Sequence, residues 1–172
     1  DENLSKFIQL EHPCFHCDMY ALKSDFVRFE LLEIYGGIYM DATCFVFEPL
    51  DWIFSDNNYS KFVAFYNPRN MSMNCDVPVI ETNFIVCPPK HPLITAWNNG
   101  CKKQIQECTK NGLVDASADL PVQYHMSATY HIVYHVLSDV LSRTPLPNYH
   151  NVLLYDAIKN NYMPFLQQIG VT

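Results

Sequence analysis

Basic residues are scarce in this chain of 172 residues. Eleven lysines and arginines stand against eighteen aspartates and glutamates, which gives a formal net charge of −7 at pH 7. A chain with this charge repels a phosphate backbone unless its few cations cluster, so we expect no nucleic-acid partner. Long apolar runs are also missing, because no stretch approaches the roughly 20 residues that a membrane-spanning helix needs. The sequence therefore predicts no transmembrane segment.

Regular cysteine spacing is the next missing feature. The chain has seven cysteines, an odd number, and its 49% hydrophobic residues suffice for one ordinary core. This pattern favours a reducing compartment, so we expect a cytoplasmic protein, or one of the Golgi lumen if the source is eukaryotic. Cys14 and Cys17 have the spacing of a zinc or redox pair, but no second pair follows. A zinc or redox protein is therefore the weakest of the function classes considered.

Hydrophobic periodicity predicts helices that alternate with short strands. Apolar side chains recur every three or four positions over residues 18–35 and then meet Gly36-Gly37, which predicts a helix that stops at the glycines. The other predicted elements are helices over 92–107 and 127–142, strands over 38–40, 44–47, 62–66, 84–87 and 152–155, and a polar loop over 69–76. Short strands alternating with helices indicate an α/β domain.

One stretch of the chain combines charged residues with these elements. Asp25 and Arg28 are three residues apart and share one face of the first predicted helix. Asp41 comes just past a predicted buried strand, in a sharp turn at the end of the sheet, where α/β domains present ligand groups. Gly36 and Gly37 are expected to bring the backbone close to that turn. If the helix packs beside the strand, Asp25 and Arg28 face the same crevice as Asp41.

Each of these residues also has an ordinary structural interpretation. Asp25 with Arg28 is consistent with a surface ion pair of about 0.2–0.5 kcal/mol. Asp41 is consistent with a simple turn residue, and the two glycines with a plain helix stop. Within the full signature over residues 24–50, a functional role for Asp25 and Arg28 is favoured over a surface ion pair, while the structural interpretations of Asp41 and the glycines stay open.

The stretch over residues 24–50 resembles the DXD-type glycosyltransferases of GT-A fold. The similar branch includes capsular polysaccharide synthesis proteins, fungal-type α-mannosyltransferases and the glucosylating domains of bacterial toxins. The resemblance rests on Ser-Asp-x-x-Arg over 24–28, Tyr-Gly-Gly-Ile-Tyr-x-Asp over 35–41, and the turn from Asp41 to Thr43 ahead of Pro49-Leu50. The segments over 81–84 and 90–93, and the helix with Tyr134-His135, resemble later parts of the family.

This resemblance implies a Rossmann-like GT-A domain that takes part in polysaccharide biosynthesis. Such a hexosyltransferase moves a sugar from a UDP- or GDP-sugar donor to a glycan or other hydroxyl acceptor, with retention of the anomeric configuration. The resemblance implies that Asp25, Arg28 and Asp41 are catalytic, with Asp25 and Arg28 holding hydroxyls of the donor sugar. The implied substrate-binding set adds Tyr35, Gly36, Gly37, Glu81, Asn83 and His135.

The resemblance also implies Mn²⁺ or Mg²⁺ as a cofactor, with Asp41 and Thr43 as ligands. Thr43 stands where the motif has a second aspartate, and its hydroxyl offers the metal only a neutral oxygen. Most ligands of such an ion would then come from phosphate oxygens and water.

Members of the similar family place a nucleotide-binding strand and helix before the Ser-Asp-x-x-Arg helix. Only twenty-three residues precede Ser24 here, and the chain opens at Asp1 without methionine or signal peptide. We therefore expect residues 1–172 to be a single glycosyltransferase domain that lacks its N-terminal nucleotide-binding segment. The alternative is a non-catalytic domain that binds a carbohydrate or a nucleotide sugar, which Thr43 and the missing segment favour.

Overall fold

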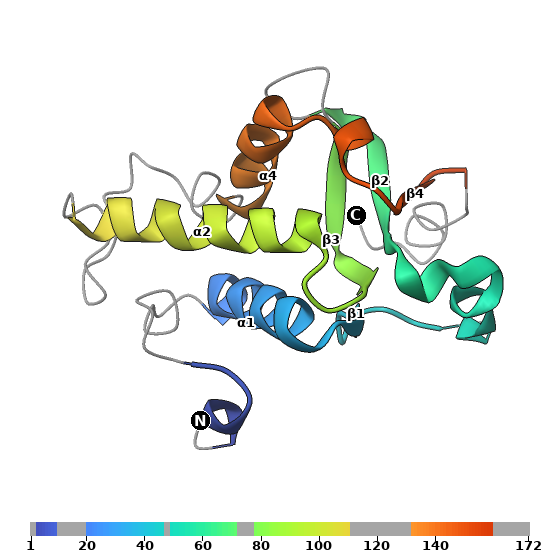
Figure 1. The fold of residues 1–172 in the computed structure, drawn as a ribbon, viewed down its shortest axis with the longest axis horizontal. Helices are drawn as coiled ribbons and strands as arrows, with labels where there is room; N and C mark the ends of the chain where they lie inside the picture. Colours follow the sequence, from blue (N-terminus) through green and yellow to red (C-terminus); the bar gives the residue numbers. More distant parts are fainter. Residues whose placement is uncertain (1–2, 10–19, 47–48, 72–77, 111–131, 160–172) are drawn as a thin grey trace.

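The structure is a computed structural model that describes residues 3–9, 20–46, 49–71, 78–110 and 132–159. Its helices and strands are α1 (Tyr20–Tyr35), β1 (Gly37–Met40), β2 (Phe62–Met71), β3 (Pro78–Cys87), α2 (Pro92–Lys110), α4 (Ile132–Arg143) and β4 (Val152–Asp156) (Figure 1). Short 3-10 helices are η1 (Leu4–Lys6), η3 (Leu50–Ile53), η4 (Ser55–Ser60) and η5 (Leu146–Asn148).

The described strands form one mixed sheet in the order β1-β3-β2-β4. β3 runs antiparallel to both β1 and β2, whereas β2 and β4 are parallel. The sheet and its helices confirm the predicted α/β class and are compatible with a Rossmann-like fold. β1 lies at one edge of the described sheet, with Ile38 39% and Met40 37% exposed. The expectation that Asp41 follows a buried strand is therefore wrong, because most of β1 is exposed and, within the described sheet, β1 pairs with β3 alone.

Helices α1, α2 and α4 cover one face of the sheet (Figure 1). Side chains alternate along a strand, so Ala64 and Ile85 join the core beneath the helices, while Val63 and Val86 face the other way. On that second face, the 3-10 helix η3 supplies Trp52, whose ring packs on other aromatic side chains of the sheet. The sheet therefore has a helical core on one face and a smaller aromatic core on the other.

The predicted helices agree with the structure wherever it describes them. α1 begins at Tyr20 and buries an apolar stripe formed by Leu22, Phe26, Phe29 and Leu32. It ends at Tyr35, and the next residue, Gly36, has φ of +64° and an amide nitrogen that donates to the carbonyl of Leu32 at 2.9 Å. α2 continues past residue 107 to Lys110, and α4 covers the predicted helix from Ile132 onward. Residues 18–19 and 127–131 of the predicted helices lie outside the described part.

Three strand predictions need correction. Residues 44–46 form no strand: Phe45 is 72% exposed and Val46 48% exposed. Residue 47 lies outside the described residues. β2 continues through Met71, where a loop is predicted from Arg69, and β3 starts at Pro78 rather than near residue 84. The two strands pair as far as Met71↔Pro78, and a proline is tolerated at the first position of a strand. Residues 72–76 of the predicted loop are not described.

Candidate functional site

A bulged segment of β3 lies at the centre of the candidate site. β2 and β3 pair at Ala64↔Ile85 and resume pairing at Tyr66↔Ile80. One residue of β2 therefore lies opposite residues 81–84 of β3, and the surplus forms a bulge. Bulges interrupt the ladder and redirect side chains and carbonyl groups. This bulge contains Glu81, Thr82 and Asn83.

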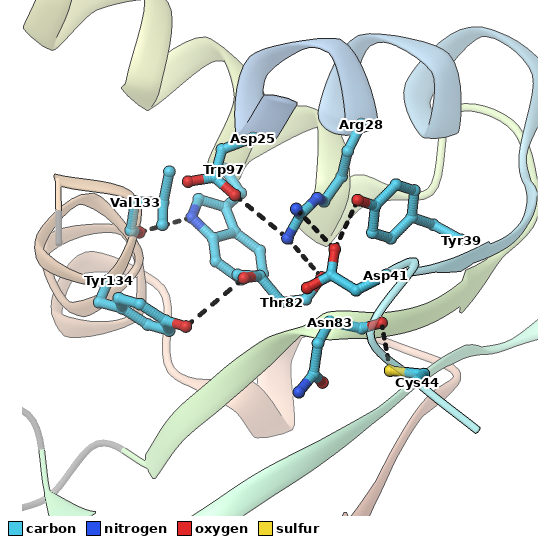
Figure 2. Close-up of polar contacts among 10 residues, drawn as sticks. All are labelled: Asp25, Arg28, Tyr39, Asp41, Cys44, Thr82, Asn83, Trp97, Val133 and Tyr134. Carbon is cyan, nitrogen blue, oxygen red and sulfur yellow. Dashed lines mark hydrogen bonds and ion pairs between the residues drawn. The ribbon is translucent and has the colours of Figure 1, made fainter. Parts of the chain in front are cut away.

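Backbone carbonyls of the bulge hold the neighbouring elements. The carbonyl of Thr82 accepts a hydrogen bond from Arg28 Nη1 of α1 at 2.6 Å. The carbonyl of Asn83 accepts from the amide nitrogen of Asp41 at 2.8 Å and from Cys44 Sγ at 3.7 Å (Figure 2). The bulge thus joins α1 to the turn that follows β1.

Asp41 is the acceptor at the centre of the polar contacts. It opens a turn in which the amide nitrogen of Cys44 donates to the Asp41 carbonyl at 2.9 Å. Its Oδ1 accepts from Arg28 Nη2 at 3.0 Å and from the Tyr39 hydroxyl at 2.6 Å (Figure 2). The Asp41 side chain is 30% exposed. Asp41 is therefore fixed through one carboxylate oxygen while part of the group faces outward.

Arg28 connects two carboxylates while being almost completely buried, with 4% of its surface exposed. Its Nη1 lies 3.1 Å from Asp25 Oδ1, and its Nη2 lies 3.0 Å from Asp41 Oδ1. The planar fork of a guanidinium suits this double pairing, which an ammonium could not reproduce. The structure thus brings Asp25, Arg28 and Asp41 together, as the sequence predicts. We call these three residues the charged cluster.

Burial shifts the pKa values of carboxyl groups at the site. The pKa of Asp25 rises from 3.8 to about 6, because burial disfavours the charged form; Arg28 opposes this rise and Asp41 adds to it. The pKa of Glu81 is raised by burial, although a hydrogen bond with Asn67 works against the change. Asp25 is therefore a group that exchanges its proton close to neutral pH.

Three residues of the site are absent from the set that the sequence predicts. Tyr39 donates to Asp41, Thr82 accepts from Arg28, and Tyr134 of α4 places its hydroxyl 3.4 Å from Thr82 Oγ1. The strand period could have found Tyr39, because residues two apart share one face. Thr82 and Tyr134 are 52 residues apart, so no local pattern signals their contact.

Several predicted site residues lie at the far end of β1. Gly37 pairs with Cys87, whereas Asp41 follows the opposite end of the strand. A Cβ on Gly36 would lie 2.6 Å from the backbone nitrogen of Pro89, and the Tyr35 hydroxyl donates to the carbonyl of Phe7 at 2.8 Å. The expectation that the glycines bring backbone close to Asp41 is therefore wrong, because β1 separates them from its turn.

The remaining predicted positions lie nearer to the charged cluster. Glu81 and Asn83 belong to the bulge, and Thr43 is exposed in the Asp41 turn. His135 follows Tyr134 on α4 and is exposed, and no contact that the structure describes joins it to the cluster.

The metal prediction depends on Asp41 and Thr43. Within the described residues there is no group of three or more histidines, cysteines or carboxylates that could hold a metal ion. Asp41 Oδ2 takes no hydrogen bond from any described residue, since both of its partners bind Oδ1. Among the described side chains, an ion at this turn would therefore have Asp41 as its single carboxylate ligand, beside the neutral hydroxyl of Thr43.

Comparison with known proteins gives one family. The family model described as capsular polysaccharide synthesis protein matches residues 1–167. No curated protein and no solved structure matches the chain. Among the described residues, no helix has the length and apolar character needed to cross a membrane.

Proposed function

The chain belongs to the capsular polysaccharide synthesis protein family, and we propose that it transfers a hexose from a nucleotide-sugar donor to a glycan or other hydroxyl acceptor. The observation that carries this proposal is the charged cluster, in which Arg28 holds Asp25 and Asp41 from two separate elements. We further propose that the domain is of GT-A type and that the reaction retains the anomeric configuration.

The proposed chemistry needs acceptors for sugar hydroxyls and stabilisation of a charged transition state. The bond from the anomeric carbon to the diphosphate breaks, and its electron pair leaves with the diphosphate. The acceptor oxygen forms the new bond to that carbon and passes its proton to an oxygen of the departing diphosphate. Positive charge develops on the sugar ring meanwhile, and carboxylates fixed beforehand stabilise it at little cost in reorganisation. Asp25 and Asp41 are suited to this role, because Arg28 fixes both.

We propose that Arg28 positions these carboxylates rather than contacting the sugar directly. Only 4% of its surface is exposed, and both of its Nη atoms already bind Asp25, Asp41 or the carbonyl of Thr82. A buried cation of this kind stabilises two neighbouring negative charges that would otherwise repel each other. This role differs from the direct hydroxyl contact that the family resemblance implies.

We propose Mn²⁺ or Mg²⁺ as the cofactor. Asp41 Oδ2 and the hydroxyl of Thr43 are the protein groups that would hold it, with phosphate oxygens and water completing the ligand set. When bound, such an ion neutralises the negative charge that grows on the leaving diphosphate.

A donor panel tests the proposal. The full-length protein, with any residues that precede Asp1, is incubated with Mn²⁺ and, in turn, UDP-glucose, UDP-galactose, UDP-N-acetylglucosamine and GDP-mannose. Release of UDP or GDP is measured, and binding is followed by calorimetry. We expect binding and turnover with at least one donor. Binding without turnover, even with hydroxyl acceptors present, would favour a non-catalytic carbohydrate-binding domain. No binding of any donor would contradict the proposed function.

A further inference from the structure

A buried tryptophan fixes the first turn of α4 relative to α1, the helix that carries Asp25 and Arg28. Trp97 of α2 is fully buried, and its Nε1 donates to the carbonyl of Val133 at 2.7 Å. The Trp97 ring also packs on Phe29 of α1, with ring centroids 4.6 Å apart. One rigid side chain therefore sets the position of α4 relative to Asp25 and Arg28.

The residue after this anchor points its hydroxyl toward the bulge. Tyr134 is half-buried, and its hydroxyl oxygen lies 3.4 Å from Thr82 Oγ1 (Figure 2). Burial raises the pKa of the Tyr134 hydroxyl; the nearby Glu81 and Asp25 add to the rise, while Thr82 and Arg28 oppose it. The hydroxyl therefore stays protonated at neutral pH and can donate a hydrogen bond.

The charges around Tyr134 indicate which part of a donor it meets. Glu81 precedes Thr82 along β3, and Asp25 pairs with Arg28, whose Nη1 binds the carbonyl of Thr82. Two carboxylates in this position repel the phosphates of a nucleotide. Carboxylate acceptors beside the hydroxyls of Tyr134 and Thr82 suit the alternating donors and acceptors of a sugar instead. The separation of 3.4 Å exceeds the roughly 2.7–2.8 Å of a strong hydroxyl pair. A sugar hydroxyl can therefore replace this contact at little cost.

We propose that Tyr134 is a specificity-determining residue that hydrogen-bonds a hydroxyl of the donor sugar. This assignment rests on the proposed function and extends it to a helix outside the motif over residues 24–50. Trp97 acts through Tyr134 as a positioning residue, because its bond to Val133 fixes the turn from which Tyr134 projects.

The test compares Tyr134→Phe with Tyr155→Phe, both in the full-length protein with any residues that precede Asp1. Tyr155 is also half-buried but packs on Trp52 on the opposite face of the sheet. Calorimetry measures binding of UDP or GDP alone and of the matching nucleotide sugar, and melting curves verify folding. We expect Tyr134→Phe to weaken binding of the nucleotide sugar about tenfold, as loss of one hydrogen bond does. Binding of UDP or GDP alone should change less than twofold. Tyr155→Phe should change neither.

Discrimination between donors gives a second readout. UDP-glucose and UDP-galactose differ in the configuration of one hydroxyl. Tyr134→Phe should bring the kcat/KM values for these two donors closer together. If the wild type distinguishes another pair of epimeric donors, that pair is compared instead. Thr82→Val removes the neighbouring hydroxyl but keeps the carbonyl that holds Arg28. This variant should also weaken binding of the nucleotide sugar more than binding of UDP or GDP.

Two results would overturn the assignment while leaving the proposed function intact. In the first, Tyr134→Phe binds the nucleotide sugar as tightly as the wild type does. In the second, the variant loses affinity for UDP and for the nucleotide sugar by the same factor, which indicates a structural role. Failure of the wild type to bind any nucleotide sugar would contradict the proposed function, and the assignment would fall with it.

Discussion

The guanidinium of Arg28 lies against the ring of Tyr39, with Cζ 4.2 Å from the ring centroid. The hydroxyl of the same tyrosine donates to Asp41 Oδ1 at 2.6 Å. Tyr39 therefore contacts the cation with its ring face and the carboxylate with its hydroxyl. Since Tyr39 and Asp41 are two residues apart along the chain, the strand period turns both toward α1.

Removal of the Tyr39 hydroxyl tests this double role. Tyr39→Phe keeps the ring beneath Arg28 but deletes a hydrogen bond to a charged group, which contributes about 1.5–3 kcal/mol. We expect the free energy of unfolding in urea to fall by about 1–2 kcal/mol, because the bond is partly exposed. Tyr20→Phe, at a side chain that is 85% exposed, is the control. If the free energy of unfolding falls equally in Tyr39→Phe and Tyr20→Phe, the hydrogen bond from Tyr39 to Asp41 does not stabilise the folded protein.

The raised pKa of Asp25 predicts a pH-dependent contribution to stability. The carboxyl titrates near its ordinary 3.8 in the unfolded chain and near 6 in the folded protein, so the folded state binds more protons between these values. Its stabilising contribution is complete below about pH 3.8 and is lost as the pH rises through about 6. The loss amounts to at most about 3 kcal/mol, at 1.36 kcal/mol for each pKa unit.

Urea unfolding of the wild type and Asp25→Asn at pH 4 and pH 7 measures this contribution. The stability of the wild type relative to the variant should decrease between pH 4 and pH 7, because the variant has no carboxyl to titrate. For the control Asp51→Asn, at an exposed position, the stability of the wild type relative to the variant should change less between pH 4 and pH 7. A difference between wild type and Asp25→Asn that stays constant or grows with pH would contradict this direction of the pH dependence.

The two glycines after α1 should differ in their tolerance of alanine. Both have positive φ, +64° at Gly36 and +100° at Gly37, which costs an L-residue about 1–3 kcal/mol. Only at Gly36 would the new Cβ clash, since it would lie 2.7 Å from the backbone oxygen of Cys87, whereas nothing lies within 4 Å at Gly37. Both variants lose stability from the positive φ, and the clash should lower the free energy of unfolding of Gly36→Ala below that of Gly37→Ala by about 1–3 kcal/mol. A larger loss in Gly37→Ala would refute this account of the helix stop.

Local pattern identified most of the described elements, but it did not give their extent and it added a strand at residues 44–47 that is absent from the described part of that segment. The three-to-four period over α1 and the Gly36 stop identify that helix, and Val152 to Tyr155 identify β4. Pro78 is a strand breaker by its local chemistry, yet it begins β3, because the pairing with β2 decides where a strand starts. Phe45 has strand propensity but lies in no strand, since β-propensity requires a neighbouring surface to pack on.

The candidate site was predictable where it depended on spacing within the chain. The three-residue interval from Asp25 to Arg28 places both on one helical face, and in the structure Arg28 pairs with both Asp25 and Asp41. The Thr82 carbonyl that holds Arg28 and the nearby Tyr134 hydroxyl come from the β3 bulge and α4. A bulge arises from strand pairing, and a helix position arises from packing, so neither leaves a periodic trace in the sequence.

Turnover of a nucleotide sugar by Asp41→Asn, compared with the wild type, tests the central claim most directly. Asparagine keeps an oxygen that can accept from Arg28 and Tyr39, so the variant should fold, which melting curves verify. Loss of the carboxylate charge at the reacting centre should lower kcat by about 10²–10³. Asp51→Asn, an exposed change in η3, should retain wild-type turnover. Equal turnover by folded Asp41→Asn and the wild type would contradict the account.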